Sequence, residues 1–306
     1  MGRYLGVDGG GTTTAFVLID DDARVLAEVS GPTSYYFAVG IELVRTVLRD
    51  GLAEVLEKAG MAAGDVDRAF FALPGYGEAS ADVPQLDRIA GDVLGHERYA
   101  CGNDMIAGWA GSLAGADGIS VVAGTGSIAY GEREGVGARA GGWGEVFGDE
   151  GSGYWMAIRG LNAFSRMSDG RLPRGPLHAR MLAAVGVGED LDVIGTVIDA
   201  WAGKRDRVAA LSREVTAAAR DGDEVAQRIV ADAGAELAAL VHAVQGRLGG
   251  PAGEEVAVSW SGGVFGDDGV RAAFAAALGT GHRLVEPAHG PAVGAALYAR
   301  KQASGA

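Results

Sequence analysis

Three glycine-rich runs, each following an apolar segment, constrain the fold of this chain more than any other feature. They are Gly6 to Thr14, Val122 to Ser127 and Ser261 to Phe265. Because glycine has no Cβ, phosphate oxygens can approach the backbone N–H groups of such turns, and neighbouring hydroxyl groups add further donors. Two phosphate-binding turns and a third glycine turn predict a nucleotide held between two domains.

The first part of the chain alternates short apolar segments with segments of helical period. Residues 41–59, for example, carry apolar side chains at Val44, Val47, Leu48 and Leu52, a spacing typical of an amphipathic helix. The expected elements are strands at 4–8, 14–19, 25–29, 68–73 and 98–101, with helices at 41–59, 83–93 and 105–113. This order predicts an α/β domain that opens with three antiparallel strands.

A second strand, glycine turn and strand unit begins at about residue 119, so we expect a domain boundary between residues 117 and 118. We expect strands at 119–123, 128–131 and 283–285, a strand and helix within 255–278, and helices at 152–167, 176–185, 190–202, 205–219, 223–247 and 291–302. The prediction is an N-terminal domain of residues 1–117 and a C-terminal domain of residues 118–306, with the closing helix 291–302 packing near the first domain.

Composition excludes several classes of protein. The 306 residues include 40 acidic and 26 basic side chains, a formal net charge of −14, which disfavours nucleic acid or an anionic membrane as a partner. No segment approaches the roughly 20 apolar residues that cross a bilayer. Cys101 is the single cysteine, which excludes an internal disulfide framework and a cysteine-ligated cluster within one chain. We therefore expect a cytoplasmic protein.

Five ordered segments together resemble a known family. They are Gly6 to Thr14, Asn103-Asp104, Gly124 to Ser127, Gly141 to Gly144 and Gly148 to Ser152. In this order and spacing they resemble the N-acetylglucosamine kinases of the BadF/BadG/BcrA/BcrD group, within the superfamily of actin, sugar kinases and heat-shock chaperone ATPases. The resemblance covers nearly the whole chain. It implies two related actin-like, ribonuclease H-like α/β domains with an interdomain cleft, and the use of ATP and Mg²⁺.

The resemblance implies that Asp104 is the catalytic base and that Asp8 holds Mg²⁺. A carboxylate at the end of a strand can accept the proton of a sugar hydroxyl, by resemblance the 6-hydroxyl, while the oxygen attacks the γ-phosphorus. Magnesium prefers partly hydrated sites with one or two carboxylates. Each residue also has a structural interpretation, since Asp104 can cap the helix that it precedes and Asp8 can form a turn before glycine.

The resemblance also implies nucleotide and sugar ligands. The residues expected to contact the phosphates of the nucleotide are Gly10, Gly11, Thr12, Thr13, Gly124, Thr125 and Gly126. Gly262 and Gly263 are expected on the adenosine side. The sugar set is Tyr35, Asn103, Asp104, Trp143, Gly144, Asp149 and Glu150. The indole of Trp143 offers an apolar face to a pyranose ring and the carboxylate of Asp149 can hold two hydroxyls. A tryptophan beside glycines can equally be a core residue, and any of these glycines can serve only a hairpin.

Two positions depart from the family pattern. Tyr35 stands where family members carry an asparagine that contacts the sugar, and a phenol cannot offer the same donor and acceptor pair as a carboxamide. Tyr76, in the turn Pro74 to Gly77, is expected to add a second bulky hydroxyl group near the site. Both changes can be neutral packing or can retune the enzyme toward glucosamine, another amino sugar or a sugar-like compound.

The sequence thus predicts an ATP-dependent kinase for N-acetylglucosamine or a related amino sugar, with a homodimer as a family-level expectation. A kinase for another sugar or a cyclitol is the main alternative. An ATPase activator of a 2-hydroxyacyl-CoA dehydratase is disfavoured, because such activators bridge an iron–sulfur cluster with two cysteines per subunit. A non-catalytic nucleotide-binding sensor is the remaining alternative. The five histidines are scattered without the spacing of a zinc site.

Overall fold

The computed structural model describes residues 1–251 and 253–304. These residues form two compact units. The first unit contains Met1–Asp117 and the segment that begins at Glu286, and the second unit contains Gly118–Val285. Among the described residues, no helix is both long enough and apolar enough to cross a membrane.

The first unit is built on a five-stranded sheet in the order β3-β2-β1-β4-β5. Its strands are β1 (Arg3–Gly9), β2 (Thr13–Asp20), β3 (Val25–Pro32), β4 (Arg68–Leu73) and β5 (Tyr99–Asn103). The pairs β1–β2 and β2–β3 are antiparallel, whereas β1–β4 and β4–β5 are parallel. Parallel strands bring their carboxyl ends to one edge of a sheet, so the loops that follow β1, β4 and β5 share that edge.

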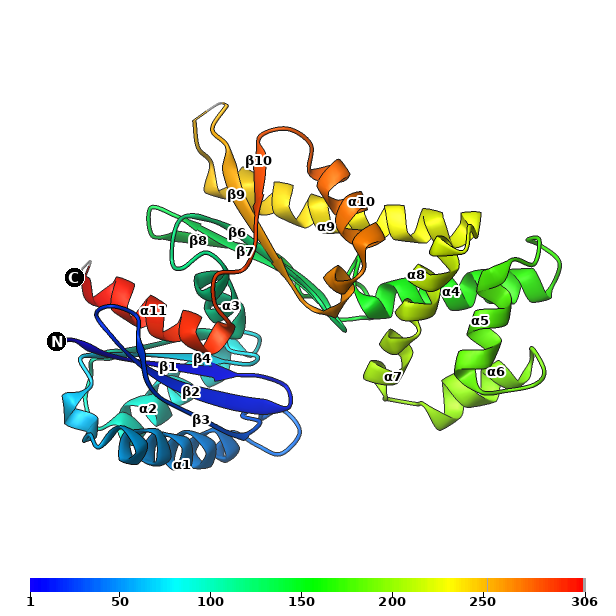
Figure 1. Cartoon of the computed structure of the whole chain (residues 1–306). Coiled ribbons are helices and arrows are strands. Elements are labelled where there is room, and N and C mark those ends of the chain that lie inside the picture. The colour runs from blue at the N-terminus through cyan, green and yellow to red at the C-terminus, as the bar shows by residue number, and fades with distance from the viewer. Residues whose placement is uncertain (252, 305–306) are drawn as a thin grey trace. The chain divides into compact units, whose positions relative to one another are not determined.

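Helices cover both faces of this sheet (Figure 1). The helices of the first unit are α1 (Glu42–Ala59), α2 (Val83–Leu94), α3 (Asp104–Ser112) and α11 (Pro291–Ser304), with 3-10 turns at Ala63–Asp65 and Ser80–Asp82. Successive residues of a strand point to opposite faces of the sheet, so their side chains pack into two separate cores. Phe71 packs with the side chains of α1 and α2, whereas Phe70 packs with those of α3 and α11.

The helix α11 crosses β1 and α3 at very short range, which small residues make possible (Figure 1). A Cβ at Gly6 would lie 2.2 Å from the backbone nitrogen of Ala296, and a Cβ at Gly294 would lie 2.1 Å from the carbonyl oxygen of Ala107. The Gly111 carbonyl oxygen also accepts a hydrogen bond from the His289 N–H at 3.0 Å. The C-terminal segment therefore fixes the position of α3, the helix that Asp104 begins.

The second unit repeats the topology of the first. Its strands are β6 (Gly118–Ala123), β7 (Ser127–Arg133), β8 (Val136–Gly141), β9 (Val256–Ser261) and β10 (His282–Val285). The order β10-β9-β6-β7-β8 has the same sequence of antiparallel and parallel pairs when it is read from β8. The predicted α/β fold class with two related domains is confirmed.

Helices make up most of the remaining second unit, and α4 to α8 gather at one end of it (Figure 1). They are α4 (Gly153–Ser168), α5 (Pro176–Val185), α6 (Asp192–Ile194), α7 (Arg205–Ala210), α8 (Ser212–Arg220), α9 (Glu224–Leu248) and α10 (Asp268–Leu278), with a π-helix at Gly195–Ala200 and a 3-10 turn at Gly263–Gly266. Their apolar side chains form one continuous core with those of the sheet.

Two expectations for this unit were wrong. The single helix expected at 190–202 is instead a short α-helix followed by a π-helix that ends where the Trp201 N–H bonds the Thr196 carbonyl oxygen at 2.9 Å. The β-branched run from Thr196 to Ile198 disfavours a regular α-helix. The segment expected as one helix at 205–219 is two helices that meet at Leu211.

Candidate active site

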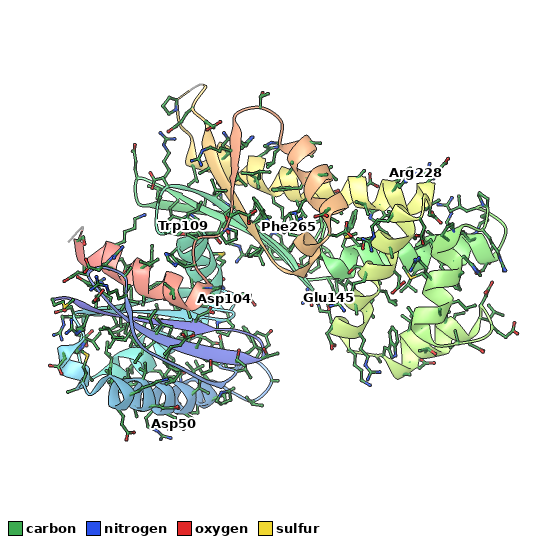
Figure 2. The ribbon with its side chains drawn as sticks, viewed as in Figure 1. Asp50, Asp104, Trp109, Glu145, Arg228 and Phe265 are labelled. Atoms are coloured by element: carbon green, nitrogen blue, oxygen red, sulfur yellow. The ribbon has the colours of Figure 1, made fainter. Side chains whose placement is uncertain are left out.

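The ends of β1 and β5 bring two carboxylates to the same edge of the first sheet. Asp8 pairs with Ala72 on β4, and Ala72 pairs with Gly102 on β5. Asp104 follows two residues later as the first residue of α3 (Figure 2). Both side chains are half-buried. The strand register therefore places both carboxylates at the edge where ligands bind in open α/β sheets.

Burial raises the pKa values of both carboxyl groups, and neighbouring negative charges raise that of Asp104 further. Desolvation raises the pKa of Asp8 to about 6. Desolvation also raises the pKa of Asp104 to about 7, and the nearby charges of Asp8 and Glu78 add to that rise, whereas the Met105 N–H opposes it. A carboxyl group whose pKa lies near neutrality can both accept and release a proton, which is the property required of a general base.

The cap of α3 is Asn103 rather than Asp104. The Oδ1 atom of Asn103 accepts a hydrogen bond from the Met105 N–H at 3.2 Å, and its Nδ2 donates to the Tyr76 carbonyl oxygen at 3.3 Å. The interpretation of Asp104 as the helix cap is therefore wrong, because the preceding residue performs that function. Asn103 is buried and both ends of its carboxamide are bonded within the protein, so it fixes the start of α3, where Asp104 lies.

The turn between β1 and β2 contains Gly10, Gly11 and Thr12, as predicted. The Gly10 N–H closes this turn on the Thr13 carbonyl oxygen at 2.8 Å. Gly11, Thr12 and Thr13 are exposed, and a Cβ on Gly11 would meet no atom within 4 Å. The tip of the turn therefore has the space that an approaching phosphate group needs.

The segment after β3 is attached to this turn. The Thr33 hydroxyl donates to the Gly10 carbonyl oxygen at 2.7 Å and accepts from the Tyr35 N–H at 3.0 Å. The Tyr35 side chain is 44% exposed and its ring lies 5.3 Å from that of Phe37. Tyr35 therefore presents an exposed phenol, and Thr33 connects its backbone to the predicted phosphate turn.

The structure favours the packing interpretation of Tyr76. Its hydroxyl donates to Asp87 on α2 at 2.9 Å, and its side chain lines a hollow of about 330 Å³ with Tyr99 and Cys101. Burial and Asp87 raise the pKa of the Tyr76 phenol and that of the Cys101 thiol above their usual ranges. The hydroxyl group of Tyr76 thus fastens the turn after β4 to α2, and its carbonyl oxygen accepts the hydrogen bond from Asn103.

In the second unit, the turn between β6 and β7 contains Gly124, Thr125 and Gly126. The Gly124 N–H closes the turn on the Gly126 carbonyl oxygen at 2.9 Å, and a Cβ on Gly124 would meet no atom within 4 Å. Thr125 is exposed at the tip. Like the first turn, the second turn is closed by a backbone hydrogen bond and has space at its tip, but its bond spans two residues rather than three.

Gly262 and Gly263 follow β9 beside the end of β6. Gly262 has a φ of 97°, and a Cβ there would lie 2.3 Å from the Ala123 carbonyl oxygen. Glycine is required at this position by both conformation and space. Gly263 is exposed and a Cβ on it would meet nothing within 4 Å, so the backbone at this turn is open to a ligand.

Trp143 and Gly144 lie in the loop that follows β8. The Trp143 side chain is 65% exposed, with the guanidinium of Arg139 5.7 Å from its ring centre. The interpretation of Trp143 as a core residue is therefore wrong. Gly144 has a φ of 84°, a conformation that glycine adopts without strain. The loop presents an indole ring to its surroundings.

Asp149 and Glu150 brace the turn between β6 and β7 from within the second unit. The Ser127 hydroxyl donates to the Glu150 carbonyl oxygen at 2.6 Å, and the Ser127 N–H donates to Oδ1 of Asp149 at 3.4 Å. The other oxygen of Asp149 pairs with Arg205 at the start of α7. Sequence reasoning missed Arg205, because nothing in the order of residues pairs one arginine with a carboxylate so distant along the chain.

The described residues contain no group of three or more histidine, cysteine, aspartate or glutamate side chains placed to hold a metal ion. A hydrated Mg²⁺ needs fewer protein ligands, because it keeps several waters and binds through one or two carboxylates and the phosphates of its substrate. The exposed edge with Asp8 and Asp104 fits that requirement.

A family model matches residues 5–299, which is nearly the whole chain. The chain belongs to the BadF/BadG/BcrA/BcrD ATPase family. The sequence resemblance to this family is thereby confirmed.

Two relatives with similar sequences are named as sugar kinases. The N-acetylmuramic acid/N-acetylglucosamine kinase of Clostridium acetobutylicum is 33% identical over 250 residues, which cover 80% of this BadF/BadG/BcrA/BcrD member and 79% of the relative. The N-acetyl-D-glucosamine kinase of Dictyostelium discoideum is 29% identical over 272 residues, which cover 85% and 84% of the two chains.

A solved structure supports the same relationship. A provisionally described N-acetylglucosamine kinase from Chromobacterium violaceum is 28% identical, has a TM-score of 0.72, and covers 98% of this BadF/BadG/BcrA/BcrD family chain and 99% of its own. The similarity therefore extends through both units.

The residues of this family member that are predicted to bind ligands are divided between its two units. The residues expected to contact sugar are Tyr35, Asn103 and Asp104 in the first unit and Trp143, Gly144, Asp149 and Glu150 in the second. Within the first unit, Asp8, Asp104 and the Gly10 to Thr13 turn share one sheet edge. Within the second, Asp149, Glu150 and the Gly124 to Gly126 turn are joined by Ser127.

Proposed function

We propose that this protein is an ATP-dependent sugar kinase that phosphorylates a hydroxyl group, the 6-hydroxyl, of N-acetylglucosamine or a related amino sugar. The observation that carries the proposal is Asp104, a half-buried carboxyl group with a pKa of about 7 at the head of α3. The names of the relatives support the choice of sugar class. The family description supports ATP as the phosphoryl donor.

Asp104 is the base in this proposal. Its carboxylate accepts the proton of the sugar hydroxyl as the oxygen attacks, and general-base catalysis by a positioned side chain contributes about 10²- to 10⁴-fold. Asn103 keeps the head of α3 fixed by bonding the Met105 N–H and the Tyr76 carbonyl oxygen. The head of α3, which carries Asp104, then does not need to be positioned during the reaction.

ATP supplies the transferable phosphoryl group, and Mg²⁺ supplies positive charge that offsets the charge of the phosphates. Asp8 is the proposed residue that holds Mg²⁺, through water. The backbone and hydroxyl donors of Gly10, Gly11, Thr12 and Thr13 hold phosphate oxygens on the first unit. On the second unit, the corresponding donors are those of Gly124, Thr125 and Gly126, and the adenosine lies against Gly262 and Gly263.

The sugar contacts proposed for the first unit are Tyr35 and Asp104, with Asn103 acting through Asp104. Those proposed for the second unit are Trp143, Gly144, Asp149 and Glu150. An exposed indole can cover the apolar face of a pyranose ring. The proposed reaction occurs in the cytoplasm, and a homodimer remains a family-level prediction.

A coupled assay of ADP release tests this proposal. The panel contains N-acetylglucosamine, N-acetylmuramic acid, glucosamine, glucose and a cyclitol, each with MgATP. We expect an amino sugar to stimulate ADP release, and we expect Asp104→Asn to lower kcat by at least 10²-fold while an ATP analogue still binds. Asp50→Asn is the matched control, because Asp50 is an exposed carboxylate on α1 of the same unit (Figure 2).

The alternatives give different results in the same experiments. A kinase for another sugar or a cyclitol is stimulated by a different member of the panel. A nucleotide-binding sensor binds ATP but shows no acceptor-dependent turnover. A dehydratase activator contains iron when it is purified anaerobically, although Cys101 alone cannot supply two ligands per subunit. The kinase proposal is withdrawn if no acceptor stimulates ADP release and Asp104→Asn leaves basal hydrolysis unchanged.

A further inference from the structure

We propose that Arg205 is a positioning residue that holds Asp149 against the turn between β6 and β7, so that sugar binding and nucleotide binding depend on one side-chain pair. This inference deepens the proposed function and rests on it for the identity of the two ligands. All of the contacts that carry it lie within the second unit.

The first observation is the environment of Asp149. Its residue surface is 4% exposed, and a carboxylate that is buried to this degree requires a counter-charge or hydrogen bonds. Burial raises the pKa of Asp149, whereas the charge of Arg205 and the Ser127 N–H oppose that rise. Arg205 pairs with Asp149, so its charge favours the ionised carboxylate and holds it in place.

The second observation is the position of the Arg205 guanidinium beside the predicted phosphate turn. A Cβ on Gly126 would lie 2.9 Å from an Nη atom of Arg205 and 2.7 Å from Oδ2 of Asp149. The turn therefore touches both members of the pair. Without the guanidinium, the negative charge of Asp149 would stand uncompensated beside a turn that receives phosphate.

The third observation is the backbone that carries Asp149. Its φ is 57°, in the left-handed region that non-glycine residues seldom adopt. Its carbonyl oxygen accepts from the Ser152 N–H at 3.1 Å, and Ser152 caps α4. A conformation of this kind persists only where the surroundings hold it. Arg205, which pairs with the Asp149 side chain from the start of α7, is one of the groups that hold this residue.

Glu145 is the second carboxylate near Arg205. Its Oε2 lies 3.1 Å from the Arg205 Nε, a distance that defines an ion pair, but Nε lacks the alignment of a hydrogen bond. The Arg205 side chain is 37% exposed and the Glu145 side chain is 34% exposed, so solvent screens this ion pair and it contributes little to stability. Figure 2 labels Glu145 in the loop that also carries Trp143 and Gly144. Arg205 thus joins three parts of the second unit: that loop, Asp149 and the phosphate turn.

The test replaces Arg205 with alanine and restores its charge from solution. We expect Arg205→Ala to raise the KM for the sugar about 10-fold or more, and to raise the Kd of an ATP analogue several-fold. Guanidinium chloride at low millimolar concentration should restore both values, because the side chain is 37% exposed and its position is therefore accessible to a small cation. Arg205→Lys should restore part of the loss, since lysine supplies charge without the planar fork.

Arg207→Ala is the matched control, because Arg207 is an exposed arginine on the same short helix. Its KM and Kd should equal those of the wild type, with or without guanidinium. Thermal unfolding of each variant shows whether the helix remains folded. A merely structural role for Arg205 would lower the midpoint of unfolding without any rescue by guanidinium.

The two proposals fail in different ways. If the wild type phosphorylates a sugar but Arg205→Ala leaves the KM for sugar and the Kd for nucleotide unchanged, the role of Arg205 is refuted and the kinase function stands. If the wild type phosphorylates no acceptor, the kinase function fails, and the Kd of the ATP analogue still tests Arg205. A loss of nucleotide affinity that guanidinium does not reverse also refutes the positioning role.

Discussion

Asp8 and Asp104 lie at the same edge of one sheet, separated by the strand β4, and the charge of Asp8 helps to raise the pKa of Asp104. Two half-buried carboxylates at such a place destabilise the folded chain when both are ionised. Sites that perform chemistry often retain such groups at a cost in stability. The relationship gives a prediction for stability that is independent of any assay of activity.

Asp104→Asn should stabilise the protein at pH 8 in the absence of Mg²⁺. The pKa of about 7 in the folded chain exceeds the usual value of 3.8. The stability that the protonated form contributes is therefore complete below about pH 4 and is lost as the pH rises through 7. Removing the ionisable group should raise the free energy of unfolding at pH 8 by roughly 1–3 kcal/mol, after discounting for the partial exposure of the side chain.

Urea unfolding of both proteins at pH 4.5 and pH 8, with a chelator present, measures this difference. The gain should shrink toward zero at the lower pH, where the carboxyl group is protonated in the folded state. Asp50→Asn, at an exposed position, should change stability little at either pH. A loss of stability in Asp104→Asn at pH 8 would mean that the carboxylate makes favourable contacts that outweigh its burial.

Gly294→Ala should destabilise the first unit and displace α3. The new methyl group would lie 2.1 Å from the Ala107 carbonyl oxygen and 2.3 Å from the Gly111 nitrogen, and both are backbone atoms that cannot rotate away. Overpacking of this kind costs roughly 1–3 kcal/mol. Because Asp104 begins α3, kcat should fall as well. Gly108→Ala, on α3 where a Cβ meets no atom within 4 Å, should leave stability unchanged or slightly raised.

Gly262→Ala should weaken nucleotide binding and lower the stability of the second unit. An alanine at a φ of 97° is strained, and its methyl group would meet the Ala123 backbone at the end of β6. We expect a loss of about 2–4 kcal/mol in the free energy of unfolding and a higher Kd for an ATP analogue. Calorimetry and titration measure the two effects. Gly266→Ala, four residues later with open space around it, should change neither quantity.

Much of the fold could be predicted, because the spacing of apolar residues and the positions of turn-forming residues indicate the same boundaries of helices and strands. The strand Arg68–Leu73 and the helix Pro176–Val185 begin and end where the pattern predicts. The strand β8 escaped prediction, because four of the six residues of Val136–Gly141 are glycine or alanine, which have low strand propensity. A Cβ on Gly137 would lie 2.3 Å from the Tyr130 hydroxyl oxygen, a contact that no local pattern encodes.

The parts of the candidate site that a backbone motif forms could be predicted. The hydrogen bonds and ion pairs between side chains could not. The two glycine turns form as expected, because glycine adopts the backbone conformations of tight turns without steric cost. The hydroxyl of Tyr76 instead bonds Asp87, and Arg205 pairs with Asp149 from a helix far along the chain. Such pairings depend on which surfaces the fold brings together, and one sequence contains no signal for them.

Tyr35→Asn should change sugar selectivity without changing stability. The phenol is 44% exposed, so its loss should alter the free energy of unfolding by no more than about 0.5 kcal/mol. A carboxamide offers a donor and an acceptor to an amido sugar, so the ratio of kcat/KM for N-acetylglucosamine over glucose should rise about 5-fold or more. Val39→Asn, at a position 71% exposed in the same segment, controls for added polarity and should leave the ratio unchanged. An equal ratio in Tyr35→Asn and the wild type would show that the phenol does not meet the sugar.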